Sequence, residues 1–292
     1  MSFLNYLVSG LSLGSVYAII ALGYTMVYGI AKMLNFAHGD VIMVGAYVCF
    51  FAFTRYGLNP FISVILAMLV CTCLGIVIEK LAYKPLRAAP SLAVLITAIG
   101  MSYLLQNIAL MIWGANPKSF PTTFINSTSL HLGKINISSA TLITILVSIV
   151  IMVLLTLFTS KTKLGKAMRC VSEDRGAAEL MGINVNRTIS LTFAIGSALA
   201  AIAGILLCSS YPILQPTTGS MPGIKAFTAA VFGGIGSIPG AMLGGVLLGI
   251  IEIFGKAYIS TELGDAIVFA VLIIVLLFKP AGLLGKPMRE KV

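Results

Sequence analysis

The sequence predicts an all-α polytopic membrane protein with about 8–9 transmembrane helices. Two observations carry this prediction. Of the 292 residues, 59% are hydrophobic and only 10% are charged, whereas a soluble domain carries about 25% charged residues. The chain also contains uncharged intervals that reach the length of about 20 residues needed for a helix to cross about 30 Å of hydrocarbon. A soluble enzyme or binding protein would need many more charged side chains on its surface.

The uncharged intervals set the order of the expected helices. They run over 1–31, 41–54, 56–78, 88–117, 135–160, 188–224, 226–251 and 266–278. No Lys or Arg precedes the apolar part of the first interval, so we expect it to remain as a span and not to act as a cleaved signal peptide. We treat residues 1–292 as one transmembrane domain.

The basic residues predict the orientation of these helices. The net charge of +10 would suggest a nucleic-acid partner in a soluble chain, but most of the basic residues lie at Lys32 and in the loops 80–87, 161–187 and 279–291. Such loops face the cytoplasm. This leaves 114–138 as a periplasmic loop, the N-terminus periplasmic and the C-terminus cytoplasmic, with membrane lipid and not nucleic acid as the surrounding partner.

Two interruptions suggest a two-repeat arrangement. The interval 41–54 is too short to span unless residues 34–40 join it, which brings His38 and Asp40 to the membrane boundary. There Asp40 could cap the helix, or both side chains could contact substrate or a proton. The second interruption is a glycine-rich segment, which we call the hinge. The glycines that follow it fit close packing of helices. Interrupted spans in both halves are typical of transporters built from two repeats. The hinge comprises Gly233, Gly234, Gly236, Pro239 and Gly240.

Polar residues within the apolar spans are the candidates for a transport pathway, although each could instead form an interhelical hydrogen bond. Glu252 must face protein or water, because an unpaired carboxylate in lipid costs a few kcal/mol. We expect no bound metal, because the five cysteines occur without paired CxxC units and His partners. The pathway candidates are Tyr28, Asn35, His38, Asp40, Thr97, Gln106, Asn107 and Glu252.

The loop 161–187 alternates apolar and charged residues at helical spacing. We expect two short helices with a bend at Gly176 and an end at Gly182. An apolar stripe of Met168, Val171, Ala178 and Met181 could dock into a partner's groove, or the loop could be a solvated connector. The chain has no GxxxxGK[ST] segment, so it cannot hydrolyse ATP by that route.

Three segments in order carry a resemblance to a known family. The first is Gly23-Tyr24-Thr25-Met26-Val27-Tyr28-Gly29 with Leu34-Asn35-Phe36-Ala37-His38-Gly39-Asp40 and Gly45-Ala46-Tyr47; the second is Gly165 to Arg169 with Glu173 to Ile183; the third is Gly233 to Ala241. With these the chain resembles the LivH-type permeases of bacterial branched-chain amino acid ABC importers over nearly its whole length. The family usually has Glu where this chain has Asp40.

The resemblance implies a type II ABC importer permease in the bacterial inner membrane, and not an enzyme. Its partners would be a second, LivM-like permease chain, two cytoplasmic ATPase subunits that hold ATP and Mg, and a periplasmic substrate-binding protein; no cofactor is expected on this chain. The loop 161–187 would couple to an ATPase subunit through Gly165, Met168, Arg169, Glu173, Asp174, Ala177, Ala178, Glu179, Met181 and Gly182.

Alternatives remain for the cargo and the energy source. Similar permeases carry urea or short amides, and no residue pattern separates these cargos from branched-chain amino acids. A proton-coupled secondary transporter would use His38, Asp40 and Glu252 as a relay. An intramembrane enzyme is disfavoured, because no Ser/His pair or metal-ligand spacing lies on an expected span.

Overall fold

The computed structural model describes residues 3–87, 89–125, 129–132 and 135–285 and is almost wholly helical. Two pairs of short antiparallel strands accompany the helices: β1 (Lys118–Ser119) with β4 (Ile213–Leu214), and β2 (Ser129–Leu132) with β3 (Ile135–Ser138). The helices are α1 (Phe3–Ala31), α2 (His38–Thr54), α3 (Pro60–Ile78), α4 (Ser91–Trp113), α5 (Ser139–Lys161), α6 (Lys163–Glu173), α7 (Arg175–Leu180), α8 (Val185–Ser210), α9 (Ser220–Gly233), α10 (Ile238–Tyr258) and α11 (Gly264–Phe278), with shorter helical turns at Glu79–Tyr83, Lys84–Leu86 and Thr122–Phe124.

Within the described ranges, six helices are long and apolar enough to cross a membrane. They are α1, α3 with the turns that extend it to Leu86, α4, α5, α8 and α10; α2 and α11 are apolar but shorter. The prediction of an all-helical polytopic membrane protein is therefore confirmed. The strands β1 to β4 lie in the segments that connect these helices.

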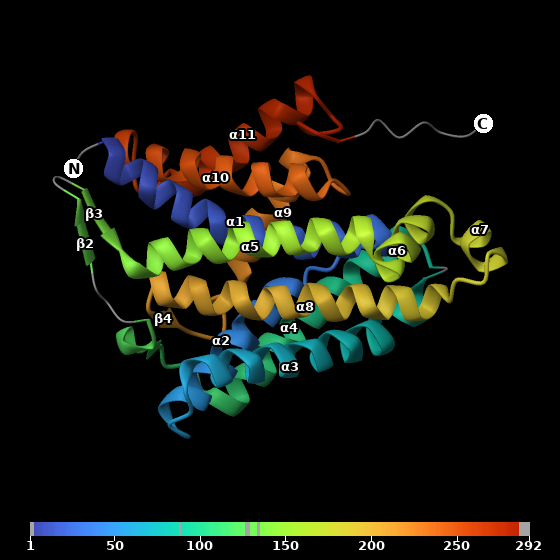
Figure 1. Ribbon diagram of the computed structural model, residues 1–292, viewed down its shortest axis with the longest axis horizontal. Coiled ribbons are helices and arrows are strands. Elements are labelled where there is room, and N and C mark those ends of the chain that lie inside the picture. Colours follow the sequence, from blue (N-terminus) through green and yellow to red (C-terminus); the bar gives the residue numbers. More distant parts are fainter. Residues whose placement is uncertain (1–2, 88, 126–128, 133–134, 286–292) are drawn as a thin grey trace.

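The long helices run side by side along the long axis of the molecule (Figure 1). The start of α1 and the strands β2 and β3 lie at one end, which we call the hairpin end. Helices α6 and α7 lie at the other, the α6–α7 end. The basic residues of the loop 161–187 lie at the α6–α7 end, on α6, α7 and the residues that flank them.

Helices α1 and α8 form the centre of the bundle. In the most apolar 18-residue window of each helix, 72% of the window is buried in α1 and 78% in α8. The buried share is 17% in both α4 and α5. The packing of α1 on α10 depends on glycine: a Cβ added to Gly249 would lie 2.2 Å from the Gly14 Cα, and one added to Gly245 would lie 2.4 Å from the Ala18 nitrogen. Backbones approach this closely only where small residues face each other. Close packing of Gly245 and Gly249 is thus confirmed.

The first interruption ends α1 at Ala31 and begins α2 at His38, so α2 does include residues before the uncharged interval. The residue that precedes α2 is Ala37, and no side chain caps the helix. The expectation that Asp40 caps α2 is wrong. Asp40 lies inside the first turn, where its carboxylate faces Gln106 of α4.

The second interruption separates α9 from α10 at the predicted hinge. Gly234 and Gly236 adopt φ angles of 109° and 94°, a region that favours glycine. Ser237 then caps α10 by accepting a hydrogen bond from the Gly240 amide. The starts of the two short helices α2 and α9 meet inside the bundle, because a Cβ on Gly219 would lie 1.8 Å from the Gly39 carbonyl oxygen.

Candidate functional site

The Asp40 cluster consists of Asp40, Ser102, Gln106 and Ser220, and it lies where α2 and α9 begin. The Gln106 Nε2 lies 2.9 Å from Asp40 Oδ1, 3.1 Å from Ser220 Oγ and 3.2 Å from Ser102 Oγ. Asp40 is 1% exposed. The amide of Gln106 therefore joins α4 to the first turns of both short helices.

His38 packs beside this cluster, against α1. Its ring lies edge-on to Tyr24 with 4.7 Å between ring centroids. A Cβ on Gly23 would lie 2.4 Å from the His38 Nε2, so only glycine leaves room for the imidazole. The structure thus holds His38 and Asp40 on the inside of the bundle, as two of the predicted pathway residues.

Glu252, the predicted intramembrane acid, belongs to a second group, the Glu252 cluster, formed by Tyr17, Lys225, Glu252, Lys256 and Asp265. Tyr17 donates to Glu252 Oε2 at 2.8 Å, while Lys225 and Lys256 approach Oε1 at 2.7 and 2.5 Å. Lys225 also approaches Asp265 at 2.5 Å. Two cations and two carboxylates thus neutralise one another across α9, α10 and α11, with Tyr17 adding α1.

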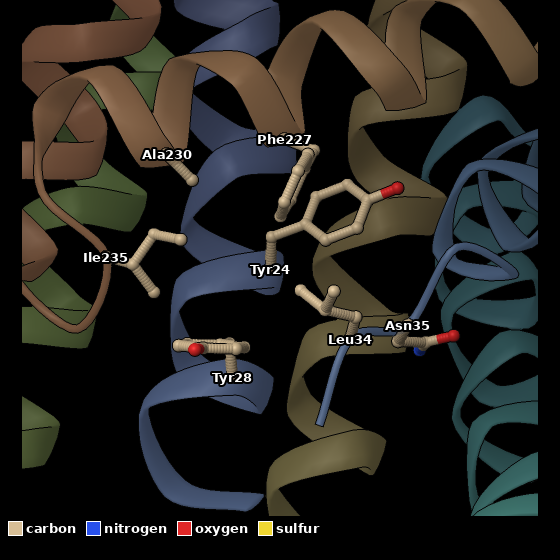
Figure 2. A pocket seen from close by; sticks show the side chains of 7 residues that line it. All are labelled: Tyr24, Tyr28, Leu34, Asn35, Phe227, Ala230 and Ile235. Atoms are coloured by element: carbon tan, nitrogen blue, oxygen red, sulfur yellow. The ribbon is translucent and has the colours of Figure 1, made fainter. Parts of the chain in front are cut away.

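A small pocket lies between α1, α9 and the segment that precedes α2. It brings together Tyr28 and Asn35 of the predicted pathway set with Ile235, which lies between the hinge glycines Gly234 and Gly236 (Figure 2). The Tyr24 and Phe227 rings lie on one side of it, and Asn35 Oδ1 accepts a hydrogen bond from the Tyr83 hydroxyl at 2.9 Å. The lining is Tyr24, Tyr28, Leu34, Asn35, Phe227, Ala230 and Ile235.

Two other pathway candidates lie apart from this pocket and from both clusters. Thr97 is half-buried on α4, and Asn107 is exposed on the outside of the chain. The Asn107 amide donates to the Tyr103 carbonyl of its own helix at 2.8 Å. Neither residue is among those that the structure groups with Tyr28, His38 or Glu252.

The loop 161–187 forms the two short helices that its pattern predicted. The break lies at Asp174 and not at Gly176, because the Asp174 carboxylate accepts the Ala177 amide and so begins α7. Gly182, with a φ of 78°, follows the end of α7 as expected.

The apolar residues of this loop face in two directions, which contradicts a single stripe. Met168, Val171 and Ala178 are buried against the chain's own helices, at 1%, 2% and 3% exposure. Leu180 and Met181 project outward, at 91% and 81%. Met181 is therefore not on the face of the other three. The remaining residues predicted to couple, apart from buried Gly165, are solvent-accessible: Arg169, Glu173, Asp174, Ala177, Glu179 and Gly182.

Arg175 at the start of α7 connects this loop to the bundle. Its guanidinium donates to the backbone oxygen of Ala31, the last residue of α1. Partial burial, and secondarily the charge of Arg87, lowers the pKa of Arg175, yet a guanidinium remains cationic at neutral pH. Arg87 donates separately to Glu79 and to Asn186, which joins the turn Glu79–Tyr83 to the start of α8.

Sequence reasoning missed several of these residues. The sequence did carry a signal for Lys225, because it is the single charged residue between two uncharged intervals. A lone cation within the membrane requires a nearby acid, such as Glu252. Tyr17, Ser102, Ser220 and Arg175 carried no comparable pattern. Their roles depend on which helices pack together.

Comparison with known proteins identifies the family. Residues 6–276 match the description "Branched-chain amino acid transport system / permease component". The high-affinity branched-chain amino acid transport permease BraD of Pseudomonas aeruginosa is 47% identical, with 99% of this chain and 98% of that protein covered, and LivH of Escherichia coli K12 is 45% identical with the same coverage.

The fold has a solved counterpart. PsaBC from Streptococcus pneumoniae, in complex with Fab, superposes with a TM-score of 0.50 at 16% identity, over 95% of this chain and 92% of that one. The family match and the two relatives cover nearly all of the helices described above. The chain therefore belongs to the permease components of branched-chain amino acid transport systems, which are transport subunits and not enzymes.

Proposed function

We propose that this chain is the membrane-spanning permease of an ATP-driven importer that moves branched-chain amino acids across the bacterial inner membrane. The observation that carries the proposal is its similarity, at 45–47% identity over nearly the whole chain, to permeases named for that transport. The helical bundle, its interrupted helices and its buried polar groups suit a permease that gives cargo a path through the membrane.

The proposed partners are a second, LivM-like permease chain, two cytoplasmic ATPase subunits with bound ATP and Mg, and a periplasmic substrate-binding protein. Leu180 and Met181 support the ATPase contact, because two large apolar side chains at 91% and 81% exposure stand at the α6–α7 end, outside the apolar spans. Apolar anchors of this kind fill pockets on partner proteins. The loops around β1 and β4, which pair with each other near the hairpin end, are the proposed contact for the binding protein.

We place nine crossings of the membrane at α1 to α5 and α8 to α11, where the short helices α2 and α9 cross together with the segments that precede them, 32–37 and 211–219. The N-terminus and the hairpin end face the periplasm, and the α6–α7 end faces the cytoplasm. The basic loop 161–187 supports this orientation through the excess of Lys and Arg on cytoplasmic sides.

The two-repeat proposal pairs α1–α4 with α8–α11. The packing supports it, because α1 packs on α10 as α8 packs on α3, and α1 packs on α9 as α8 packs on α2. The short helices α2 and α9 then occupy equivalent places and meet at Gly39 and Gly219. In this arrangement the Asp40 cluster and the pocket lined by Tyr28 both lie where the two repeats meet.

A proton-coupled transporter finds little support in the geometry. Glu252 is held by Lys225, Lys256 and Tyr17, and among the described residues no hydrogen bond joins it to His38 or Asp40. Energy supplied by ATPase subunits through the α6–α7 end is therefore the better account.

Reconstitution tests the proposal. The chain, its permease partner and the ATPase subunits are placed in proteoliposomes with the binding protein and ATP, and uptake of labelled leucine, isoleucine and valine is measured. Uptake that requires both ATP and the binding protein is the expected result. Uptake of urea or acetamide in place of the amino acids would overturn the cargo, and uptake driven by a proton gradient without ATP would overturn the energy source.

A further inference from the structure

The outer faces of α4 and α5 differ, although both helices lie at the edge of the bundle with 17% of their apolar windows buried. On α5 the large exposed residues are all aliphatic, which suits lipid, and the exposed polar residue Thr156 lies near the end of the helix. The large exposed residues are Leu142, Ile143, Leu146, Ile149, Val150, Val153, Leu154 and Leu157. On α4, Gly100, Tyr103 and Asn107 are exposed among aliphatic neighbours. Their spacing of three and four residues places them on one face of the helix, and we call them the α4 stripe.

The α4 stripe lies at a depth where lipid cannot satisfy it. Residues 100–107 occupy the middle of a 23-residue helix, and therefore the middle of the hydrocarbon layer. Asn107 donates one hydrogen bond, to the Tyr103 carbonyl of its own helix, which leaves its carbonyl oxygen and second amide hydrogen for another partner. An unsatisfied polar group in hydrocarbon is costly, so such residues normally face protein or water.

Gly100 adds room for a close approach. A Cβ at this position would meet nothing within 4 Å, so the space beside the helix is open. Membrane helices pack most closely where glycine lies on one face and polar side chains can hydrogen-bond across. The stripe therefore has the composition of a helix–helix contact and not that of a lipid-facing surface.

The α4 stripe also borders the Asp40 cluster. Ser102 and Gln106, which are half-buried, lie on α4 next to the stripe, and Gln106 reaches Asp40 and Ser220. The main neighbours of α4 within its own chain are α2 and the turn Glu79–Tyr83. A helix from another chain packed on the stripe would thus complete the wall around Gln106 and Asp40.

We propose that the α4 stripe is the surface on which the second permease chain packs, and that the Asp40 cluster consequently lines the path between the two chains. This inference rests on the proposed function, which supplies a second membrane chain. The depth of the stripe selects that partner, because ATPase subunits and a binding protein lie outside the hydrocarbon layer and cannot reach Tyr103 or Asn107. Only a membrane-spanning chain can.

Photo-crosslinking in the complete complex tests the contact. Tyr103→p-benzoylphenylalanine keeps an aromatic side chain on the stripe, and Leu146→p-benzoylphenylalanine places the same probe on the aliphatic face of α5, where the native residue is 64% exposed. The expected result is an adduct between position 103 and the second permease chain, with none from position 146. An adduct from 146 and not from 103 would overturn the proposal, as would labelling of lipid alone at 103.

Assembly gives a second measurement. Asn107→Leu and Gly100→Leu should weaken association with the second permease chain by about 3-fold to 30-fold each, the effect of losing one interhelical hydrogen bond or close contact. Leu146→Ala is the matched control, and unchanged association in both α4 variants would contradict the inference. If the purified complex contains no second membrane chain, the proposed function itself fails. If it contains one and transports, but the crosslinks arise elsewhere, only the assignment of the surface fails.

Discussion

Arg175 of α7 donates a hydrogen bond to the backbone oxygen of Ala31, where α1 ends. This contact joins the exposed loop at the α6–α7 end to the central helix of the bundle. The last carbonyl groups of a helix lack partners within it and carry partial negative charge, so a guanidinium is well suited to them. Beyond Ala31 the chain turns into α2, which begins two residues before Asp40.

Arg175→Ala should therefore separate ATP hydrolysis from transport. A hydrogen bond from a charged group contributes about 1.5–3 kcal/mol, and its loss frees α7 to move without α1. We expect ATPase subunits to remain bound and active while amino-acid uptake per ATP falls about tenfold or more, taking 1.4 kcal/mol per factor of ten. Arg175→Lys, which keeps the charge, should retain an intermediate ratio, and the control is Lys163→Ala, because Lys163 is exposed on α6. An unchanged ratio in Arg175→Ala would refute the coupling role.

Leu180 and Met181 should determine whether the ATPase subunits bind. The double change Leu180→Asp and Met181→Asp places two charges at the most exposed apolar positions of the loop, so the ATPase subunits should be lost on purification while the permease keeps its thermal stability. Ala178→Asp should act differently, because Ala178 is 3% exposed and packs against its own chain; there the permease itself should unfold at lower temperature. Retention of the ATPase subunits in the double variant would exclude Leu180 and Met181 as the contact.

The sequence of this loop predicted its helices better than their orientation. Helical periodicity, a bend and the final Gly182 all follow from local preferences, and the structure has them in the expected order. The side on which Met181 lies depends on the break at Asp174, which shifts the register between α6 and α7. The cap that the Asp174 carboxylate forms is a local feature. Whether the chain bends at Asp174 or at Gly176 depends on how the loop packs against α1 and α8.

The same limit applies within the membrane. Uncharged intervals and glycine breaks predicted the spans and the hinge at Gly233 to Gly240, because lipid allows few alternatives to a helix. They did not predict that Gln106 meets Asp40 and Ser220, or that Lys225 meets Glu252. Those pairs join residues 27 to 114 positions apart, and only the packing of α2, α4, α9 and α10 brings them together.

The Glu252 cluster should be destabilised by removing one charge. Lys225→Met leaves Asp265 without its buried partner and removes one of the two lysines that contact Glu252, and breaking a buried ion pair costs about 3–5 kcal/mol. We expect a lower melting temperature in detergent, measured by fluorescence-detected size-exclusion chromatography. Glu252→Gln added to Lys225→Met should restore part of the loss, because the charges balance again. Glu262→Gln, on an exposed turn, is the control; equal stability of Lys225→Met and wild type would contradict an energetic role for the pair.

The glycine contact between α1 and α10 should tolerate no added methyl group. A Cβ on Gly14 would lie 2.6 Å from the Val246 carbonyl oxygen, which belongs to a rigid backbone, so Gly14→Ala should force α1 and α10 apart. Gly29→Ala is the matched control on the same helix, since its Cβ would meet only the Gly236 Cα at 3.4 Å. We expect Gly14→Ala to lower the melting temperature and Gly29→Ala to leave it unchanged or raise it, because alanine favours helix by about 1 kcal/mol over glycine. The opposite order would show that α1 and α10 do not pack through this face.

Cys170 provides a test of the proposed orientation without any substitution. Its thiol is exposed on α6, while Cys49, Cys71 and Cys208 are buried and Cys73 lies in the apolar helix α3. A membrane-impermeant maleimide reacts only with thiolates that water reaches, so it should label inside-out vesicles and leave intact spheroplasts unlabelled. Cys170→Ser should abolish the labelling, which identifies the residue. Labelling of Cys170 in intact spheroplasts would place the basic α6–α7 end outside the cytoplasm, and the ATPase contact at Leu180 would then be impossible.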